Sequence, residues 1–229
     1  METQNKTVMI TGSSKGIGEG LALVFSKNGY NVIIHGRDKK KLGVVKQEIE
    51  KNNVSCHVVV GDITSKKNLD NLSDIARKQD ISILINNAGL PCPYLPLHKI
   101  NDEQVDDIIN TNLIAPIKLT HRIYRFFLEK KAGTIVNINS LSGLESHYLR
   151  TIYCASKWGL RGFTNVLRKE AKENNIRIIG VYPGRTKTKP EYTYGMTVEF
   201  VANKIFDYCQ SPNDDDLILD NRPKDVKRE

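Results

Sequence analysis

The chain has 229 residues, and its formal net charge is +8 at pH 7. No run of about 18 apolar residues is present, so the sequence predicts no membrane-spanning helix. The first residues, METQNKTVMITG, lack the charged start, apolar core and small-residue cleavage site of a signal peptide. We therefore expect a cytoplasmic protein without a membrane partner. The length of the chain suits one large domain or two small ones.

The positive charge is spread along the chain and forms no basic arm, so no nucleic-acid partner is predicted. A solvated basic surface explains the net positive charge. A second explanation, that the charge attracts small anionic molecules, stays open. The four cysteines are widely spaced, with no C-x-x-C and no histidine at zinc spacing: Cys56, Cys92, Cys154 and Cys209. This pattern favours free thiols in a reducing compartment and predicts no metal site.

Short β-branched runs alternate with longer amphipathic stretches along the chain. The predicted strands are 8–11, 32–35, 54–60, 81–85, 134–138, 176–181 and 217–219. Most of them are apolar on both faces, which is typical of a parallel sheet covered by helices on both sides. The last run is short, and we expect it at an edge of the sheet.

The predicted helices cover about 17–28, 38–52, 65–78, 102–130, 151–173 and 197–208. Asn101 and Thr197 are expected N-caps. Pro116 lies inside the longest helix, so a break or kink is expected near it. Strand–helix alternation with short links predicts one doubly wound α/β domain over residues 1–219. The charged stretch 220–229 is expected to be a flexible tail.

A glycine-rich turn, TGSSKGIG, follows the first strand at residues 11–18. Gly12, Gly16 and Gly18 permit a left-handed backbone and the close approach of a ligand. The next helix would direct its N-terminal amide groups at a pyrophosphate. Because a strand precedes the turn and a helix follows it, this context favours a dinucleotide site over a turn that binds no ligand.

With this loop the sequence resembles the short-chain dehydrogenase/reductase family, whose cofactor loop has the form T-G-x-x-x-G-x-G. Further segments match the family pattern in order, between residue 6 and about residue 188. They are Asp62 to Thr64, Asn86 to Gly89, Asn112, Ser140, Tyr153, Lys157, and Pro183-Gly184-x-x-x-Thr188. The resemblance implies a Rossmann-type sheet and an NADP(H)- or NAD(H)-dependent oxidoreductase.

Tyr153 and Lys157 lie four residues apart, a spacing that composition alone would produce about once in such a chain. Their place thirteen and seventeen residues after Ser140 is what gives the pair significance. A helix brings both side chains to one face. A nearby ammonium lowers the pKa of a phenol from about 10 toward neutral pH, where general acid–base catalysis works best.

The resemblance implies that Tyr153 is the general acid–base and that Lys157 also hydrogen-bonds the nicotinamide ribose. It implies that Ser140 polarises the substrate oxygen and that Asn112 holds a water of a proton relay. Taken singly, each residue is typical of a loop, a helix surface or side-chain packing, but together they favour catalysis. The alternative is a non-catalytic NADP(H)-binding sensor on the same fold.

The end of the second strand indicates which dinucleotide is bound. An acidic residue there would accept hydrogen bonds from the ribose 2′-hydroxyl of NAD, but this sequence has Gly36 followed by Arg37. Lys15 stands where NADPH-using members of the family carry a base. Two cations suit a 2′-phosphate, so NADP(H) is predicted. A one-residue shift of the strand end would instead bring Asp38 toward the ribose.

The predicted cofactor-binding residues follow the first six strands. They are Gly12, Ser13, Ser14, Lys15, Gly16, Ile17, Gly18, Arg37, Asp62, Ile63, Asn87, Ala88, Gly89, Tyr153, Lys157, Pro183, Gly184, Thr186 and Thr188. The short segment 189–196 predicts an open cleft in which Tyr192 and Tyr194 can touch substrate. His147 is expected on the surface or in the cleft lining.

The predicted substrate is a small carbonyl compound or alcohol. Three classes stay open: 3-oxoacyl thioesters, semialdehydes of small 3-hydroxy acids, and xenobiotic carbonyls. The resemblance implies a homodimer through the two long helices or a homotetramer. The C-terminal DLILDNRPKDVKRE departs from the family pattern, so the choice between dimer and tetramer stays open.

Overall fold

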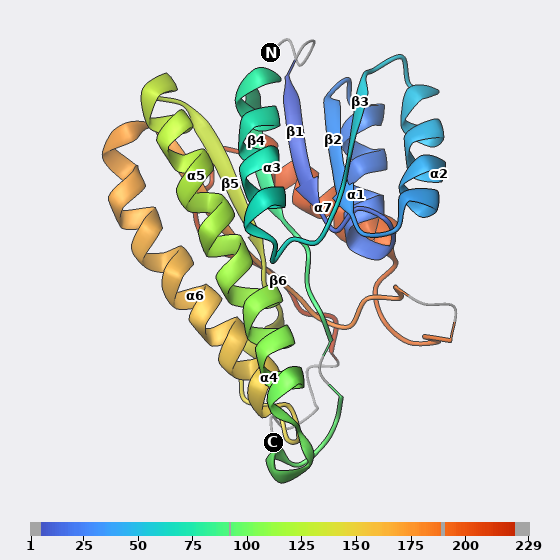
Figure 1. Ribbon diagram of the computed structural model, residues 1–229, viewed down its shortest axis with the longest axis vertical. Coiled ribbons are helices and arrows are strands. Elements are labelled where there is room, and N and C mark those ends of the chain that lie inside the picture. Colours follow the sequence, from blue (N-terminus) through green and yellow to red (C-terminus); the bar gives the residue numbers. More distant parts are fainter. Residues whose placement is uncertain (1–5, 92, 189–190, 223–229) are drawn as a thin grey trace.

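The computed structural model describes residues 6–91, 93–188 and 191–222. Within these ranges one parallel sheet has the strand order β3-β2-β1-β4-β5-β6-β7. The strands are β1 (Thr7–Thr11), β2 (Asn31–Gly36), β3 (Cys56–Val60), β4 (Ile81–Asn86), β5 (Gly133–Ile138), β6 (Ile176–Pro183) and β7 (Leu217–Leu219). The chain winds outward in one direction from β1 and then in the other from β4, which confirms the doubly wound, Rossmann-type fold (Figure 1).

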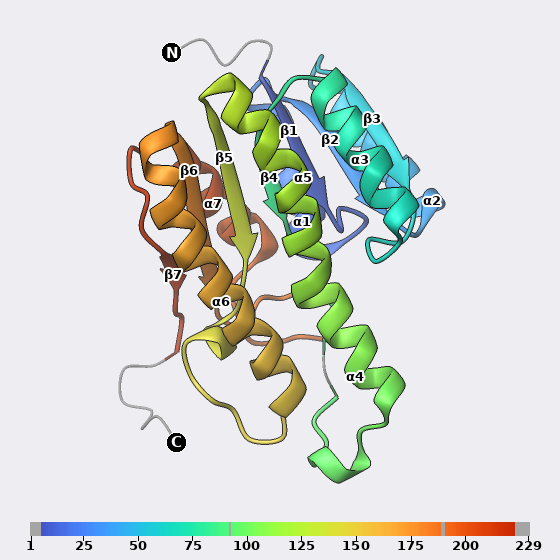
Figure 2. The same ribbon diagram turned by 60° about the vertical axis from the view of Figure 1, so that its left-hand side comes forward.

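Helices cover both faces of the sheet (Figures 1 and 2). One layer holds α1 (Gly16–Lys27), α2 (Lys39–Glu50) and α7 (Val198–Gln210). The other holds α3 (Lys66–Lys78), α5 (Ala115–Lys130) and α6 (Thr151–Ala171), while α4 (Asp102–Ile109) leads into α5. Short helical turns occupy Leu97–Lys99, Leu141–Gly143 and Lys172–Asn174. Among the described residues, none of these helices is both long and apolar enough to cross a membrane.

Alternation of side chains along the strands supplies a core on each face of the sheet. On β1, Val8 and Ile10 pack toward α1 and α7, whereas Met9 packs toward α3 and α5. Phe25 of α1 is fully buried in the first core and meets the rings of Tyr30 and Phe206 edge-on at 5.1 and 5.0 Å. Such aromatic contacts add to the hydrophobic free energy of burial.

The predicted helix over 102–130 is broken by a π-helical turn at Asn110–Ile114. Pro116 is the second residue of α5. Because proline has no N–H, it cannot donate the hydrogen bond that an α-helix would direct to the carbonyl of Asn112, and a wider turn accommodates the loss. The break expected near Pro116 is confirmed, and it falls on Asn112.

Most element boundaries lie within two residues of those predicted. The predicted caps are confirmed: Asn101 accepts a hydrogen bond from the backbone N–H of Gln104, and Thr197 accepts one from that of Phe200. β6 runs to Pro183, beyond the predicted end, because Pro183 still lies opposite Leu219 of β7. Neither local propensity nor apolar pattern reveals such a cross-strand partner.

Part of the predicted tail and one cysteine lie outside the described residues, namely 223–229 and Cys92. Of the tail, Arg222 is described and donates two hydrogen bonds to Glu145, at 2.7 and 3.0 Å. Cys56, Cys154 and Cys209 are free thiols. Burial raises the pKa of the Cys56 and Cys209 thiols to about 12, so both are protonated at neutral pH.

Replacing Phe25 with alanine should lower the free energy of unfolding by about 3–5 kcal/mol, because it removes two ring contacts and leaves a cavity between α1, α7 and the sheet. Urea denaturation measures this change. The control is Val44→Ala, because Val44 on α2 is 58% exposed and should change stability by less than about 0.5 kcal/mol. A loss below about 1 kcal/mol for Phe25→Ala would contradict this account of the core.

Candidate active site

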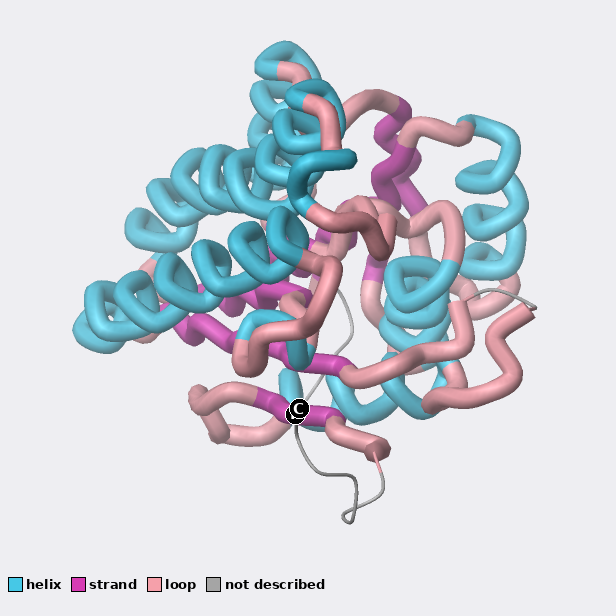
Figure 3. The backbone as a smooth tube through the Cα atoms, turned by 90° about the horizontal axis from the view of Figure 1, so that it is seen from below, coloured by secondary structure: helices cyan, strands magenta, loops and turns pink. Residues whose placement is uncertain are grey.

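The carboxyl ends of the first six strands open into a cavity of about 860 Å³. The loops that follow the strands gather at this edge of the sheet (Figure 3). In open α/β sheets, ligands bind at this edge, where the strand order reverses. The predicted cofactor residues that line the cavity are Gly12, Ser14, Lys15, Gly16, Ile17, Arg37, Asp62, Ile63, Asn87, Ala88, Gly89, Tyr153, Lys157, Pro183, Gly184, Thr186 and Thr188.

Two predicted cofactor residues, Ser13 and Gly18, lie behind the cavity wall and shape it. The Ser13 hydroxyl donates to the carbonyl of Ile10 at 2.5 Å, and its backbone N–H donates to the carbonyl of His35 at 2.8 Å. A Cβ atom on Gly18 would lie 2.3 Å from the carbonyl oxygen of Gly12. Gly18 therefore allows α1 to pack directly against the loop that follows β1.

The glycine loop has the backbone geometry that the sequence predicted. Gly12 and Gly16 adopt left-handed φ values of 68° and 60°, which cost a glycine little. α1 starts at Gly16, and the side chain of Lys15 caps none of its first amide groups. These N–H groups can therefore donate to phosphate oxygens of a ligand in the cavity.

Lys15 and Arg37 line the cavity where it opens to solvent, and both residues are exposed. Arg37 Nη1 lies 3.9 Å from Asp62 Oδ2. Hydrogen bonds from Thr64 hold the pKa of the Asp62 carboxyl below its ordinary value. Asp38 does not line the cavity; its Oδ1 caps α2 by accepting the Lys41 N–H at 3.1 Å.

The loop after β4 is hydrogen-bonded to the loop after β1. The backbone N–H groups of Asn87 and Ala88 both donate to Thr11 Oγ1 at 3.0 Å. Asn87 Nδ2 donates to the carbonyls of Thr11 and Gly12 at 2.8 and 3.1 Å. The Asn-Asn-Ala-Gly segment thereby holds the cofactor loop in place as well as lining the cavity.

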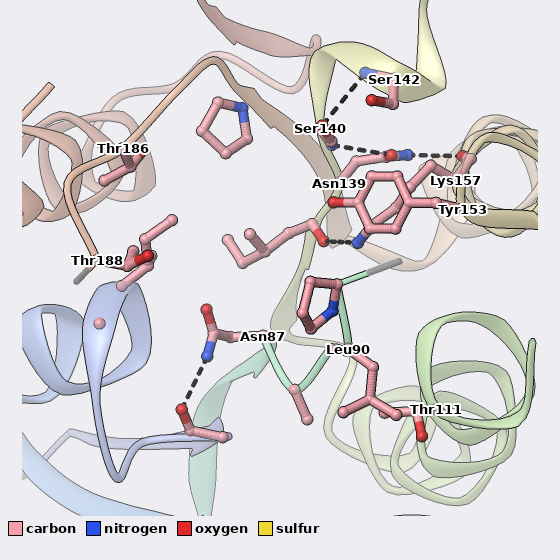
Figure 4. Close-up of a pocket in the computed structure, with 18 of the residues that line it drawn as sticks. Asn87, Leu90, Thr111, Asn139, Ser140, Ser142, Tyr153, Lys157, Thr186 and Thr188 are labelled. Atoms are coloured by element: carbon pink, nitrogen blue, oxygen red, sulfur yellow. Dashed lines mark hydrogen bonds between the residues drawn. The ribbon is translucent and has the colours of Figure 1, made fainter. Parts of the chain in front are cut away.

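Ser140, Tyr153 and Lys157 meet on one wall of the cavity, with Thr186 and Thr188 on the other side (Figure 4). Tyr153 and Lys157 are one turn apart on α6, and Ser140 follows β5. Lys157 is only 6% exposed, and its Nζ donates to the carbonyl of Ile138 at 3.0 Å. The Lys157 ammonium lies 5.8 Å from the centre of the Tyr153 ring.

Asn139 fixes the position of this wall. Its Oδ1 accepts the backbone N–H of Ser140 at 3.0 Å, and its Nδ2 donates to the carbonyl of Lys157 at 3.0 Å. One buried amide therefore couples the end of β5 to the middle of α6. The sequence did not single out Asn139, because this role depends on the approach of two elements that are distant in the chain.

Burial raises the pKa of Tyr153, and the Arg150 guanidinium and a hydrogen bond with the Ser140 hydroxyl oppose the rise. Burial lowers the pKa of Lys157 to about 8, and repulsion from Arg150 adds to the effect. Arg150 is thus a second cation beside the Tyr-Lys pair, and no motif of the sequence pointed to it. Its place three residues before Tyr153, one helical turn away, is the signal that could have revealed it.

Asn112 lies in the π-helical turn and is 1% exposed. Its side chain accepts the backbone N–H of Leu90 at 2.7 Å and donates to the Leu90 carbonyl at 3.0 Å. Nδ2 also lies 3.4 Å from Ser156 Oγ on α6. Asn112 does not line the cavity; its amide ties the loop after β4 to α6, and its role in a proton relay stays a prediction.

The other end of the cavity is rich in aromatic and basic side chains. His147, Tyr192 and Tyr194 line it, in agreement with the predicted cleft lining. The residues there that sequence reasoning missed are Tyr94, Arg150, Arg185 and Arg222. All four belong to loops or to the start of a helix, so no local periodicity marks them. No group of three or more candidate metal ligands occurs among the described residues.

The short chain dehydrogenase family model matches residues 6–195. An NADP-dependent 3-hydroxy acid dehydrogenase from Schizosaccharomyces pombe is 34% identical over 191 residues, which cover 80% of this chain and 73% of that protein. The chain therefore belongs to the short-chain dehydrogenase/reductase family of oxidoreductases, as its motifs predicted.

Solved structures show the same fold. A ketone-specific alcohol dehydrogenase from Comamonas testosteroni superimposes with a TM-score of 0.85 at 29% identity, over 93% of this chain and 85% of that one. A short-chain dehydrogenase from Sphingobium yanoikuyae, solved in complex with NADPH, gives 0.84 at 25% identity, over 93% and 87%.

His35 should make the stability of the protein depend on pH. It is 2% exposed, its Nδ1 has no hydrogen-bond partner among the described residues, and burial lowers its pKa to about 4 from 6.5. Between these pH values His35 is protonated in the unfolded chain but neutral in the folded chain. The free energy of unfolding therefore falls as the pH drops from about 6.5 to 4.

The measurement compares urea unfolding of the wild-type protein with that of His35→Gln at pH 8 and pH 4.5. The wild type should lose up to about 3 kcal/mol more than the variant over this range. The difference at pH 8, where His35 is neutral in both states, isolates any change in packing. An equal loss in both proteins would show that His35 is not the group responsible.

Proposed function

We propose that this protein is an NADP(H)-dependent oxidoreductase that transfers a hydride between the nicotinamide and a small carbonyl compound or secondary alcohol. The observation that carries the proposal is the convergence of Ser140, Tyr153 and Lys157 on the wall of a cavity that begins at the glycine loop. The relatives named for NADP dependence and for an NADPH complex support the choice of cofactor.

The residues present fit NADP(H) along the whole cavity. The uncapped start of α1 at Gly16 suits the diphosphate. Lys15 and Arg37 at the rim suit the 2′-phosphate. Asp62 and Ile63 line the part next to them, where the adenine would lie. The segment from Pro183 to Thr188 faces the catalytic wall, where the nicotinamide would lie.

When bound, NADPH supplies the hydride that reduces the carbonyl carbon. The Tyr153 hydroxyl donates a proton to the carbonyl oxygen, so the carbonyl gains one hydride and one proton and becomes an alcohol. The Ser140 hydroxyl hydrogen-bonds the same oxygen and stabilises its developing negative charge. Lys157 favours the phenolate that Tyr153 leaves behind, and a relay past Asn112 restores the proton. Oxidation of the alcohol runs in reverse.

A sensor that only binds NADP(H) is the competing function. Such a protein needs a cofactor site but no proton donor beside the nicotinamide. The placement of the Tyr153 hydroxyl next to Ser140, with two cations close by, favours the enzyme. Tight NADPH binding without turnover of any ketone, aldehyde or 3-oxo ester would favour the sensor.

Tyr153→Phe should lower kcat/KM for carbonyl reduction by about 10²–10⁴-fold, because it removes the proton donor and leaves the ring in place. NADPH oxidation at 340 nm measures turnover, and a fluorescence titration measures NADPH affinity, which should change little. Tyr124→Phe is the matched control, since Tyr124 lies on α5 and does not line the cavity. Turnover that survives Tyr153→Phe would refute the mechanism.

Replacing Lys15 and Arg37 together with alanine should weaken NADPH binding by about 10–100-fold and leave NADH binding nearly unchanged, because only NADPH carries the 2′-phosphate. Binding titrations with both nucleotides measure the change. Lys46→Ala is the control, because this partly exposed lysine of α2 pairs with Glu50 and does not line the cavity. Equal weakening of NADPH and NADH would disprove the assignment of the 2′-phosphate site.

A further inference from the structure

The Arg150 side chain lies between two aromatic rings at the substrate end of the cavity. Its guanidinium carbon is 4.4 Å from the centre of the Tyr153 ring and 5.0 Å from the centre of the Tyr94 ring. All three residues line the cavity. Tyr94 comes from the loop after β4, and Arg150 directly precedes α6. The two rings hold a cation beside the proposed proton donor.

Among the described residues, no acceptor of a hydrogen bond from the Arg150 guanidinium is found. Guanidinium N–H groups point outward in the plane of the group, where a planar acceptor can take two of them. Arg150 Nε is buried and has no hydrogen-bond partner within residues 6–91, 93–188 and 191–222. Within the described part of the chain, no carboxylate forms an ion pair with Arg150, which is unusual for a half-buried cation.

Arg222 also lines the cavity, but unlike Arg150 its guanidinium is hydrogen-bonded to carboxylates. It donates to Glu145 at 2.7 and 3.0 Å and to Asp220 at 2.6 and 2.9 Å, so protein carboxylates balance its charge. His147 contributes little charge near neutral pH, because burial and the Arg150 guanidinium hold its pKa below its ordinary value. Arg150 therefore adds uncompensated positive charge at this end of the cavity.

We propose that Arg150 binds the carboxylate of the substrate, and that the substrates are small oxo acids and the matching hydroxy acids. A carboxylate accepts two parallel hydrogen bonds from a guanidinium edge. The position also favours a short substrate. Arg150 lies 4.4 Å from the centre of the ring whose hydroxyl would meet the carbonyl oxygen, so a carboxylate near the carbonyl, as in a 3-oxo acid, suits the site. This inference rests on the proposed oxidoreductase function.

The first test compares an acid with its neutral ester. Acetoacetate and methyl acetoacetate share one ketone and differ in the charge of the group that Arg150 would bind. The wild-type protein should reduce the acid with the higher kcat/KM. Arg150→Met should lower the ratio of acid to ester by about 10–100-fold, because a charged, bidentate contact is lost. Arg150→Lys keeps the charge without the planar fork and should lower the ratio less.

Arg161→Met is the matched control. Arg161 lies on the same helix, stacks on Trp158 at 5.6 Å and does not line the cavity. The substitution removes the same charge and a similar ring contact, so the acid-to-ester ratio should not change. If Arg150 acted only on the pKa of Tyr153, Arg150→Met would slow the acid and the ester by the same factor, and an unchanged ratio would overturn the proposal.

A binding experiment separates this inference from the proposed function. With NADPH bound, 3-hydroxybutanoate and its methyl ester cannot be oxidised, so calorimetry measures binding alone. Tighter binding of the acid that disappears in Arg150→Met supports the carboxylate site even if no ketone is turned over. Turnover of neutral ketones with no preference for acids, in binding or in rate, overturns the carboxylate site and leaves the oxidoreductase intact. If Arg150→Met does not fold, the same comparisons with Arg150→Lys decide the question.

Discussion

Thr11 and Asn87 join the two halves of the sheet at the point where its strand order reverses. Four hydrogen bonds between the ends of β1 and β4 fix the distance between the cofactor loop and the loop that carries Ala88 and Gly89. The closeness of Gly18 to the Gly12 carbonyl then positions α1 on this loop. Without this junction the amide groups at the start of α1 would have no defined relation to the rest of the cavity.

The cavity wall that carries Ser140, Tyr153 and Lys157 depends on a similar arrangement on the other half of the sheet. Asn139 couples Ser140 to the backbone of Lys157, and Lys157 in turn donates to the carbonyl of Ile138. Removing a lysine and a tyrosine from water disfavours the charged form of each. Arg150 shifts this balance, since its positive charge favours the Tyr153 phenolate and disfavours the Lys157 ammonium. The same side chain would therefore bind the substrate and adjust the proton donor.

The sequence predicted the fold and most of the residues that line the cavity, because both follow from local patterns. Buried parallel strands are apolar on both faces, and two helices have a start signal, at Asn101 and Thr197. The glycine loop and the Tyr-Lys pair are short motifs on single elements. Asn139 and Tyr94 were missed for the opposite reason, because their partners are remote in the chain. Arg150 was missed although one helical turn separates it from Tyr153.

The order of the elements, the family, the Tyr-Lys pair and the two cations Lys15 and Arg37 can be read from the sequence alone, since each depends on local motifs on a strand, turn or helix. Which side chains gather around Arg150 depends on the tertiary structure. It placed Tyr94, from the loop after β4, against Arg150 at the start of α6, and it paired Arg222 with Glu145. Whether an arginine is paired with a carboxylate of the protein or can bind a ligand depends on contacts between segments that are distant in the chain. Those contacts exist only in the folded protein.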